Sequence, residues 1–263
     1  MGVSRFLDRV VAAVALVSVV VARPAPVQVD GCGPSGKVET FEPPKHLLIF
    51  SLLAVKLRDP PTFPGVNPSP SWTPPPIGWI FKPWNQVLTS NSQAAQLRNF
   101  QWDPTPVTDS DPTGPINDLS SFQIPGNDTV FTSYGVAIPN DTYVAVLDYR
   151  GTGILENATS QYSWLGWGCD GNGIEYYVSY STAAEASGTP AGIDVMSLVD
   201  TGLDQATTDR IVAILKQSES EEIRNIAETF VENIQDGGRQ GLGRITECDD
   251  ECKTNKDLIG IIG

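Results

Sequence analysis

The sequence predicts a mostly β fold: an eight-stranded antiparallel up-and-down barrel with C-terminal α-helices packed on its outside. Residues 78–199 contain eight short segments rich in aromatic and β-branched residues, separated by clusters of turn-forming residues. No helical pattern falls between these segments, which favours antiparallel pairing of neighbours. The pattern changes to a helical period only after them, in residues 203–236. Eight strands can close into a barrel that leaves no unprotected edge.

The chain before the strands is predicted to consist of a signal peptide (1–22) and a Pro-rich N-terminal arm (23–77). Two arginines precede a 12-residue apolar stretch, 10–21, which is shorter than the roughly 20 residues that span a bilayer. We therefore expect a secreted, extracellular protein with no transmembrane segment in the mature chain. Ten of the 21 prolines fall in residues 41–76. Because proline donates no backbone hydrogen bond, this zone is excluded from a sheet interior.

The clearest pair of strands is a hairpin formed by residues 160–168 and 174–182. The connecting residues 170–173, Asp-Gly-Asn-Gly, supply the positive φ angles that tight turns need. In the second strand the even-numbered residues face one way and the odd-numbered residues the other, which predicts one buried and one wetter face. The predicted strands are 78–88, 97–103, 119–124, 130–138, 142–150, 160–168, 174–182 and 193–199.

Two helices are predicted after the strands. Ile211, Ile214 and Leu215 share one face of the first helix. We expect both helices to pack on the barrel; the alternative is a surface for a protein partner. The barrel with the first helix then spans 78–217, and the second helix with a Cys-containing tail spans 218–263. The second helix is predicted from an apolar stripe of Ile223, Ile226, Ala227, Phe230, Val231 and Ile234.

The cysteines and glycosylation sequences agree with secretion. The mature chain would keep four cysteines, an even number that suits two disulfides in an oxidising compartment. Four cysteines allow three different pairings into two disulfides. Cys248 and Cys252 can pair locally, or one of them can link the tail to Cys169. The candidate disulfide residues are Cys32, Cys169, Cys248 and Cys252. Asn-x-Thr sequences predict glycosylation at Asn127, Asn140 and Asn157.

The charge and the histidine content exclude several functional classes. The formal net charge is −14 and the isoelectric point is about 4.4, whereas a nucleic-acid-binding protein needs a basic surface that neutralises phosphates. His46 is the single histidine, it lies in the Pro-rich zone, and no Gly-x-Ser-x-Gly motif occurs. The sequence therefore predicts no nucleic-acid partner, no cofactor, no metal site and no catalytic residue.

Several segments resemble the lipocalin (calycin) family. Residues 189–217 resemble the last strand, short loop and amphipathic helix of that family, and Gly78-Trp79 with Trp84 lie where its opening strand would fall. The whole chain is similar to secreted fungal lipocalin-like proteins. Residues 160–182 are more weakly similar to the lipocalin-type domain of violaxanthin de-epoxidase. The resemblance implies an eight-stranded barrel that carries a helix on its outside.

A barrel of this kind can enclose one small ligand, and we expect a small hydrophobic molecule as the partner. Ligand pockets are mostly apolar with a few orienting polar groups, and Tyr and Trp side chains combine an apolar body with a polar tip. The predicted strands are rich in such residues. The candidate ligand-binding residues are Trp102, Phe122, Tyr134, Tyr149, Trp164, Tyr176 and Tyr180.

Two alternatives to a binding protein remain open at this stage. An enzyme on the same barrel could act on an isoprenoid-like or epoxide substrate, and it would need a buried carboxylate as a proton donor. Asp148 and Glu175 are the candidates for that role because they lie within predicted strands. The other alternative is an extracellular interaction protein whose barrel is filled by side chains; the sequence does not identify its protein partner.

Overall fold

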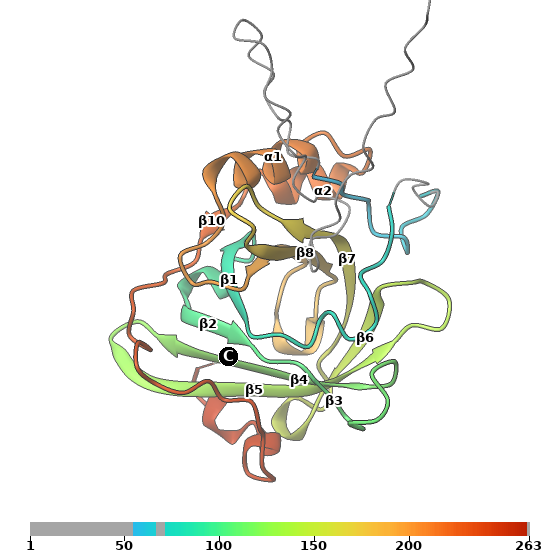
Figure 1. Cartoon of the computed structure of the whole chain (residues 1–263). Coiled ribbons are helices and arrows are strands. Elements are labelled where there is room, and N and C mark those ends of the chain that lie inside the picture. The colour runs from blue at the N-terminus through green and yellow to red at the C-terminus, as the bar shows by residue number, and fades with distance from the viewer. Residues whose placement is uncertain (1–54, 67–71, 262–263) are drawn as a thin grey trace, which may run out of the picture.

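The computed structural model describes residues 55–66 and 72–261, and it contains a closed barrel of eight antiparallel strands (Figure 1). Each strand pairs with the next along the chain, and the last pairs back with the first. The predicted eight-stranded up-and-down barrel is therefore confirmed. The strands are β1 (Trp84–Thr89), β2 (Arg98–Trp102), β4 (Ile116–Ile124), β5 (Asn127–Pro139), β6 (Val146–Gly151), β7 (Thr159–Cys169), β8 (Glu175–Ser181) and β9 (Gly192–Ser197).

Shorter elements complete the chain. Two two-residue strands extend the sheet: β3 (Thr105–Pro106) pairs with β4, and β10 (Val231–Glu232) pairs with β1. The signal peptide predicted at 1–22, together with His46 and Cys32, lies outside the described residues. The remaining elements are α1 (Gln205–Leu215), α2 (Glu221–Ala227) and the 3-10 turns Ala94–Gln96, Gly153–Leu155, Glu185–Ser187, Cys252–Thr254 and Lys256–Leu258.

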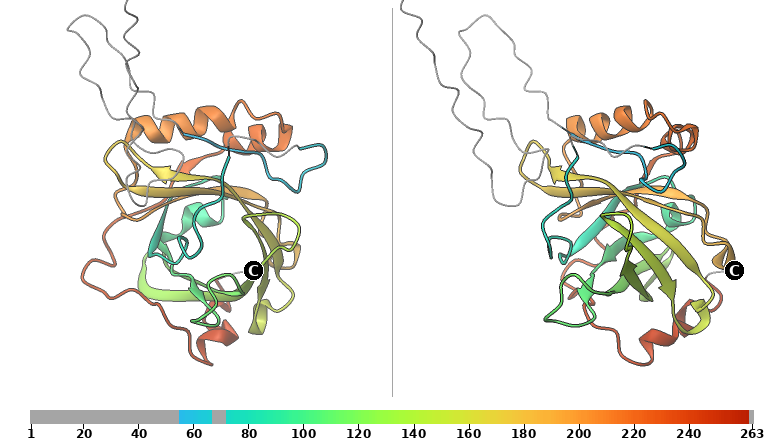
Figure 2. Two further views of the ribbon diagram at one scale, coloured as in Figure 1. Left: turned by 45° about the vertical axis from the view of Figure 1, so that its right-hand side comes forward. Right: turned by 90° about the vertical axis from the view of Figure 1, so that its right-hand side faces the viewer.

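The two helices lie next to each other across one side of the barrel, over β8 and β9 (Figures 1 and 2). Ile211 of α1 and Ile223 of α2 are fully buried there against outward-facing side chains of the barrel. Both helices begin at a side-chain cap, because Asp204 accepts a hydrogen bond from the Thr207 amide and Ser220 accepts one from the Ile223 amide. The expectation that the helices pack on the barrel is confirmed.

The second helix is shorter than its apolar stripe predicts. It ends at Ala227, and the stripe residues Val231 and Ile234 are 45% and 41% exposed. The chain instead turns back to the barrel, where Val231–Glu232 pairs with β1 and the Asn233 amide donates to the Val87 carbonyl. Backbone pairing with a strand edge therefore outweighs the helical period beyond Ala227, and the predicted helix over this stretch is wrong.

Both faces of β8 are buried, so the prediction of one wetter face is also wrong. Tyr176 and Val178 point outward into the core shared with α1 and α2. Tyr177 and Ser179 point inward and line a cavity in the barrel. The reason is that the helices cover the outer face of this strand, which removes the solvent-exposed side that an isolated sheet would have.

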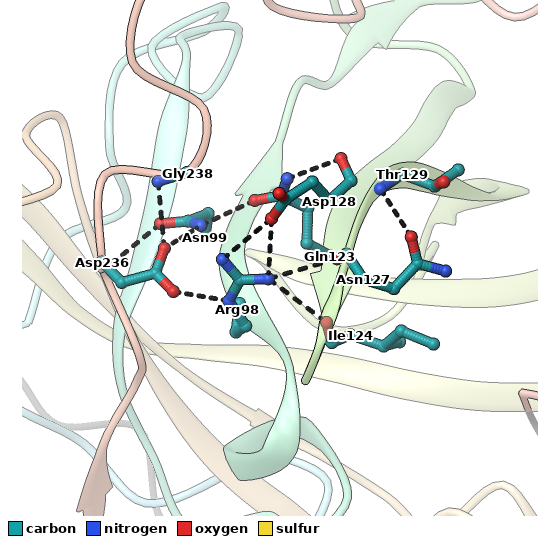
Figure 3. Close-up of polar contacts among 9 residues, drawn as sticks. All are labelled: Arg98, Asn99, Gln123, Ile124, Asn127, Asp128, Thr129, Asp236 and Gly238. Atoms are coloured by element: carbon teal, nitrogen blue, oxygen red, sulfur yellow. Dashed lines mark hydrogen bonds and ion pairs between the residues drawn. The ribbon is translucent and has the colours of Figure 1, made fainter.

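The C-terminal tail runs back along the barrel and is fastened at two places. At the first, the Arg98 guanidinium lies between Asp236 and Asp128, and the Asn99 amide group donates to Gln123 and Asp236 (Figure 3). These donors hold the pKa of the Asp236 carboxyl well below its usual range. The contacts tie the tail to β2 and to the β4–β5 hairpin.

At the second place, Asn255 joins the tail to the outer face of β5. Its side-chain nitrogen donates to the carbonyls of Tyr134 (2.9 Å) and Thr152 (2.8 Å), and its side-chain oxygen accepts from the Tyr134 amide. Cys248 and Cys252 form a disulfide just before it, which is the local one of the predicted pairings. Cys169 is also in a disulfide, and Cys32, the remaining cysteine, lies outside the described residues.

The end of the predicted Pro-rich arm packs on β7. Arg58 donates to the Trp164 carbonyl (2.9 Å), and the Trp72 indole donates to the Leu165 carbonyl (2.8 Å). The Arg58 guanidinium also stacks 3.6 Å from the centre of the Trp72 ring. This part of the arm is a packed segment and not a free linker. None of the helices in the described ranges has both the length and the apolar character needed to cross a bilayer.

Candidate ligand-binding cavity

The interior of the barrel contains a cavity of about 80 Å³. A single water needs roughly 10–15 Å³, so the space holds several waters or a small organic molecule. Seven of the eight barrel strands contribute inward-facing side chains to its wall. These side chains are Gln86, Phe100, Trp102, Asp118, Ser120, Leu147, Tyr162, Trp164, Tyr177, Ser179, Asp194 and Met196.

A cluster of tryptophans closes the barrel at the end where β1 begins. Trp79, in the segment before β1, packs 5.0 Å from the ring centres of both Trp84 and Trp167. The Trp84 side chain is fully buried, its indole nitrogen donates to the Ile80 carbonyl (2.7 Å), and its ring meets Tyr177 edge-on at 4.8 Å. Because Tyr177 also lines the cavity, this cluster forms the floor under it.

Four of the seven predicted ligand-binding residues face the barrel interior. Trp102 and Trp164 line the cavity directly. Phe122 stacks 6.1 Å from Phe100, a residue of the cavity wall, and Tyr149 meets the wall residue Tyr162 edge-on at 5.9 Å.

The Tyr149 ring lies over a glycine on the neighbouring strand β5, diagonal to it in the β5–β6 pair. Gly135 lies on the inward face of β5, and a Cβ atom at this position would lie only 2.3 Å from the Tyr149 ring. A larger residue would therefore displace the ring from its place beside Tyr162. The glycine leaves space for a large aromatic side chain within the narrow barrel.

The other three predicted residues lie on the outer surface of the barrel. The Tyr134 hydroxyl donates to Asn117 (2.7 Å), and its backbone is bound by the tail. Tyr176 and Tyr180 belong to the core beneath the helices, and the Tyr180 hydroxyl donates to Glu222 of α2. Alternation along the strands places these three side chains opposite the inward-facing set, so the cavity does not include them.

Two carboxylates in the cavity wall were not among the predicted residues. Asp118 on β4 accepts a hydrogen bond from the Trp102 indole (2.9 Å). Asp194 on β9 accepts hydrogen bonds from Thr89 (2.6 Å) and from the Gln86 side chain. Burial raises the pKa of each to about 6, an effect only partly offset by these donors. The wall is therefore aromatic but carries two groups that are negatively charged at neutral pH.

Asp148 and Glu175, the carboxylates that the enzyme alternative would use, lie away from the cavity. Asp148 accepts hydrogen bonds from Asn140 and Gln161, both at 2.8 Å, on the outer face of β6. Glu175 forms an ion pair with Lys82 near the tryptophan floor. Neither carboxylate is among the residues that line the cavity, so the enzyme alternative is not favoured.

The comparisons with known proteins give one curated relative and several distant solved structures. No protein-family model matches the chain. The chain is 27% identical over 223 residues to "Botcinic acid biosynthesis cluster B protein 12" of Botryotinia fuckeliana, a similarity that covers 80% of this chain and 96% of that protein.

Three of the similar solved structures share 9% to 14% identity with the chain and have TM-scores near 0.40. Lobster apocrustacyanin A1 has a TM-score of 0.40 at 14% identity, covering 59% of this chain and 76% of its own. The possum milk whey lipocalin trichosurin has 0.39 at 9%, covering 63% and 100%. The amine binding protein of Rhodnius prolixus has 0.39 at 14%, covering 67% and 86%. With its ring of eight antiparallel strands and its two outer helices, the chain has the lipocalin-like (calycin) barrel fold.

Proposed function

We propose that this protein binds a small hydrophobic molecule inside its barrel and is secreted to do so. The observation that carries the proposal is the cavity of about 80 Å³ behind a wall that includes Trp102, Trp164 and Tyr177. A barrel filled by its own side chains, as the interaction-protein alternative requires, would not keep such a space. The cavity is small beside the cavity of about 150 Å³ that holds one benzene ring in another protein, so its size favours a compact ligand of a single ring. The name of the curated relative associates that protein with a small-molecule biosynthesis cluster, which agrees with a small organic ligand.

The proposal predicts saturable binding that depends on the cavity. Small neutral compounds such as phenol and benzyl alcohol should quench the fluorescence of Trp102 and Trp164 to a plateau, because both rings line the space. Ser179→Leu should abolish the quenching, since it places a larger side chain in the cavity. Ser110→Leu is the matched control, because residue 110 is exposed. Flat titration curves for the wild type with neutral and cationic one-ring compounds alike would rule the proposal out.

Secretion and glycosylation are part of the same proposal. The Cys248–Cys252 disulfide supports an oxidising compartment. Of the three candidate glycosylation sites, Asn157 is exposed, whereas Asn127 and Asn140 are half-buried and Asn140 donates to Asp148. We expect glycan first at Asn157. Peptide mapping of protein recovered from the culture medium of a eukaryotic host tests this, and an unmodified Asn157 peptide in secreted material would contradict it.

A further inference from the structure

We infer that the ligand is a small aromatic or aliphatic amine whose ammonium group pairs with the Asp118 carboxylate inside the barrel. This inference rests on the proposed function, because it assigns a chemical class to the molecule in the same cavity. It is carried by the charge and the hydrogen bonding of the cavity wall, not by the fold.

The cavity wall has negative groups and no positive ones. Asp118 and Asp194 both line it, and no Lys, Arg or His is among the described residues of the wall. Neither carboxylate has an ion-pair partner elsewhere in the described part of the chain. The carboxylates that do form ion pairs there are Asp103, Asp128, Glu175, Glu228, Asp236 and Asp250.

The hydrogen bonding distinguishes the two cavity carboxylates. Asp194 accepts from two side chains, Thr89 and Gln86. Asp118 is 7% exposed, yet within the described ranges one donor reaches it, the Trp102 indole on its Oδ1 atom. Its second oxygen is left with acceptor capacity in the cavity wall. Buried charged groups in proteins are normally paired, so this oxygen is where a cation from outside would bind.

The rest of the wall suits the other parts of an amine. Trp102, Trp164 and Tyr177 present aromatic rings to the cavity, and a cation within about 6 Å of an aromatic face is attracted to it. The same rings offer an apolar surface to the hydrocarbon part of the ligand. Leu147 and Met196 extend that surface. The wall therefore combines a carboxylate with aromatic rings, a combination that stabilises an organic ammonium group.

Anionic ligands are disfavoured for two reasons. An anionic ligand would lie beside two buried carboxylates, where the low dielectric strengthens like-charge repulsion. The formal net charge of −14 also attracts cations to the protein and repels anions before they reach the barrel. A neutral ligand avoids the repulsion, but it leaves the free oxygen of Asp118 without a cation.

The test compares 2-phenylethylamine with 2-phenylethanol by isothermal titration calorimetry of the full secreted chain at pH 7.5. The two probes have the same ring and chain length and differ in an ammonium against a hydroxyl group. We expect the amine to bind about tenfold more tightly or better, because hydrogen bonds to a charged partner are the stronger class. Asp118→Asn should remove most of this preference, and Asp194→Asn should reduce it less. Asp109→Asn removes the same charge from an exposed loop residue and should leave it unchanged.

A pH series on the wild type gives a second readout that needs no variant. Amine affinity should fall as the pH is lowered through about 6, where Asp118 takes up a proton, while alcohol affinity stays level. Asp194 lines the same cavity and its pKa is also raised to about 6, so the fall reports the protonation of both wall carboxylates. The tyrosines that interact with Asp118 are Tyr134, Tyr149, Tyr162 and Tyr177. Burial raises the pKa of each above 10, so they stay neutral throughout the series.

The outcomes of these experiments distinguish the assignment of an amine ligand from the proposed binding function. Equal or tighter binding of the alcohol, or an amine preference that survives Asp118→Asn, would overturn the assignment of an amine and leave the binding function intact. A preference lost equally in Asp109→Asn would also overturn it, since surface charge would then be the cause. If neither probe binds and the neutral compounds above also fail, the proposed function itself falls.

Discussion

Trp84→Ala should lower the free energy of unfolding by about 4 kcal/mol, in line with the 3–5 kcal/mol that removing a buried aromatic side chain costs. Trp84 is fully buried, and its ring contacts both Trp79 and Tyr177. The substitution also leaves the Ile80 carbonyl without its indole donor. The floor of the cavity would lose its central ring, and the surrounding rigid strands could not collapse fully into the space.

Urea unfolding followed by far-ultraviolet circular dichroism measures this effect without relying on tryptophan emission. Ile77→Ala is the control, because Ile77 lies in the same segment as Trp79 but is 75% exposed, and its truncation should change the stability by less than about 0.5 kcal/mol. A loss below about 1 kcal/mol for Trp84→Ala would mean that the tryptophan cluster does not form the floor of the barrel.

Asp118→Asn should stabilise the ligand-free protein at pH 7.5 by about 2–3 kcal/mol. Burial raises the folded-state pKa of Asp118 from its ordinary value of 3.8 to about 6, and one pKa unit corresponds to about 1.4 kcal/mol. The folded state thus holds a proton more strongly than the unfolded state does. The stability from protonating Asp118 is fully present below about pH 4 and is lost as the pH rises through about 6. Asparagine stays neutral at every pH and can still accept the Trp102 hydrogen bond.

Chemical denaturation of the wild type and of Asp118→Asn at pH 4.5 and at pH 7.5 checks both the direction of the stability change and the pH range in which it appears. The stability difference between Asp118→Asn and the wild type should be largest at the higher pH and fall to about a third of that value at the lower one. The exposed-site variant Asp109→Asn should show no such pH dependence. A destabilised Asp118→Asn at pH 7.5 would show that the carboxylate already has a cationic partner in the free protein, which would also remove the basis for an amine ligand.

The strand pattern was readable from the sequence, but the direction in which each strand faces was not. All eight predicted strands overlap observed ones, because aromatic and β-branched runs between turn residues are a local property. A shift of one residue reverses the two faces of a strand, and both faces of β8 carry tyrosine. The helices that bury Tyr176 and Tyr180 on the outside come from a later part of the chain. Local alternation alone could not show which tyrosines line the cavity.

The two cavity carboxylates were missed for a related reason. Asp118 lies just before the predicted strand 119–124, and β4 in fact begins at Ile116. Asp194 is flanked by the buried residues Ile193 and Val195, and alternation puts it on the same face as Met196. That placement was a usable signal, but an acidic residue in a strand more often faces solvent. The enclosure of both groups follows from barrel closure, which pairs β9 with β1 across more than 100 residues of sequence.

A crystal structure of the protein soaked with 4-bromophenol tests most directly whether the barrel holds a ligand, because the bromine can be located by its anomalous signal. The probe is neutral under mildly acidic to neutral conditions, so its binding does not depend on the preference for an amine. We expect one bromine site inside the barrel, between the rings of Trp102 and Trp164. Bromine found only in the outer groove beside Ile77 and Pro112, with side chains filling the barrel interior, would contradict it.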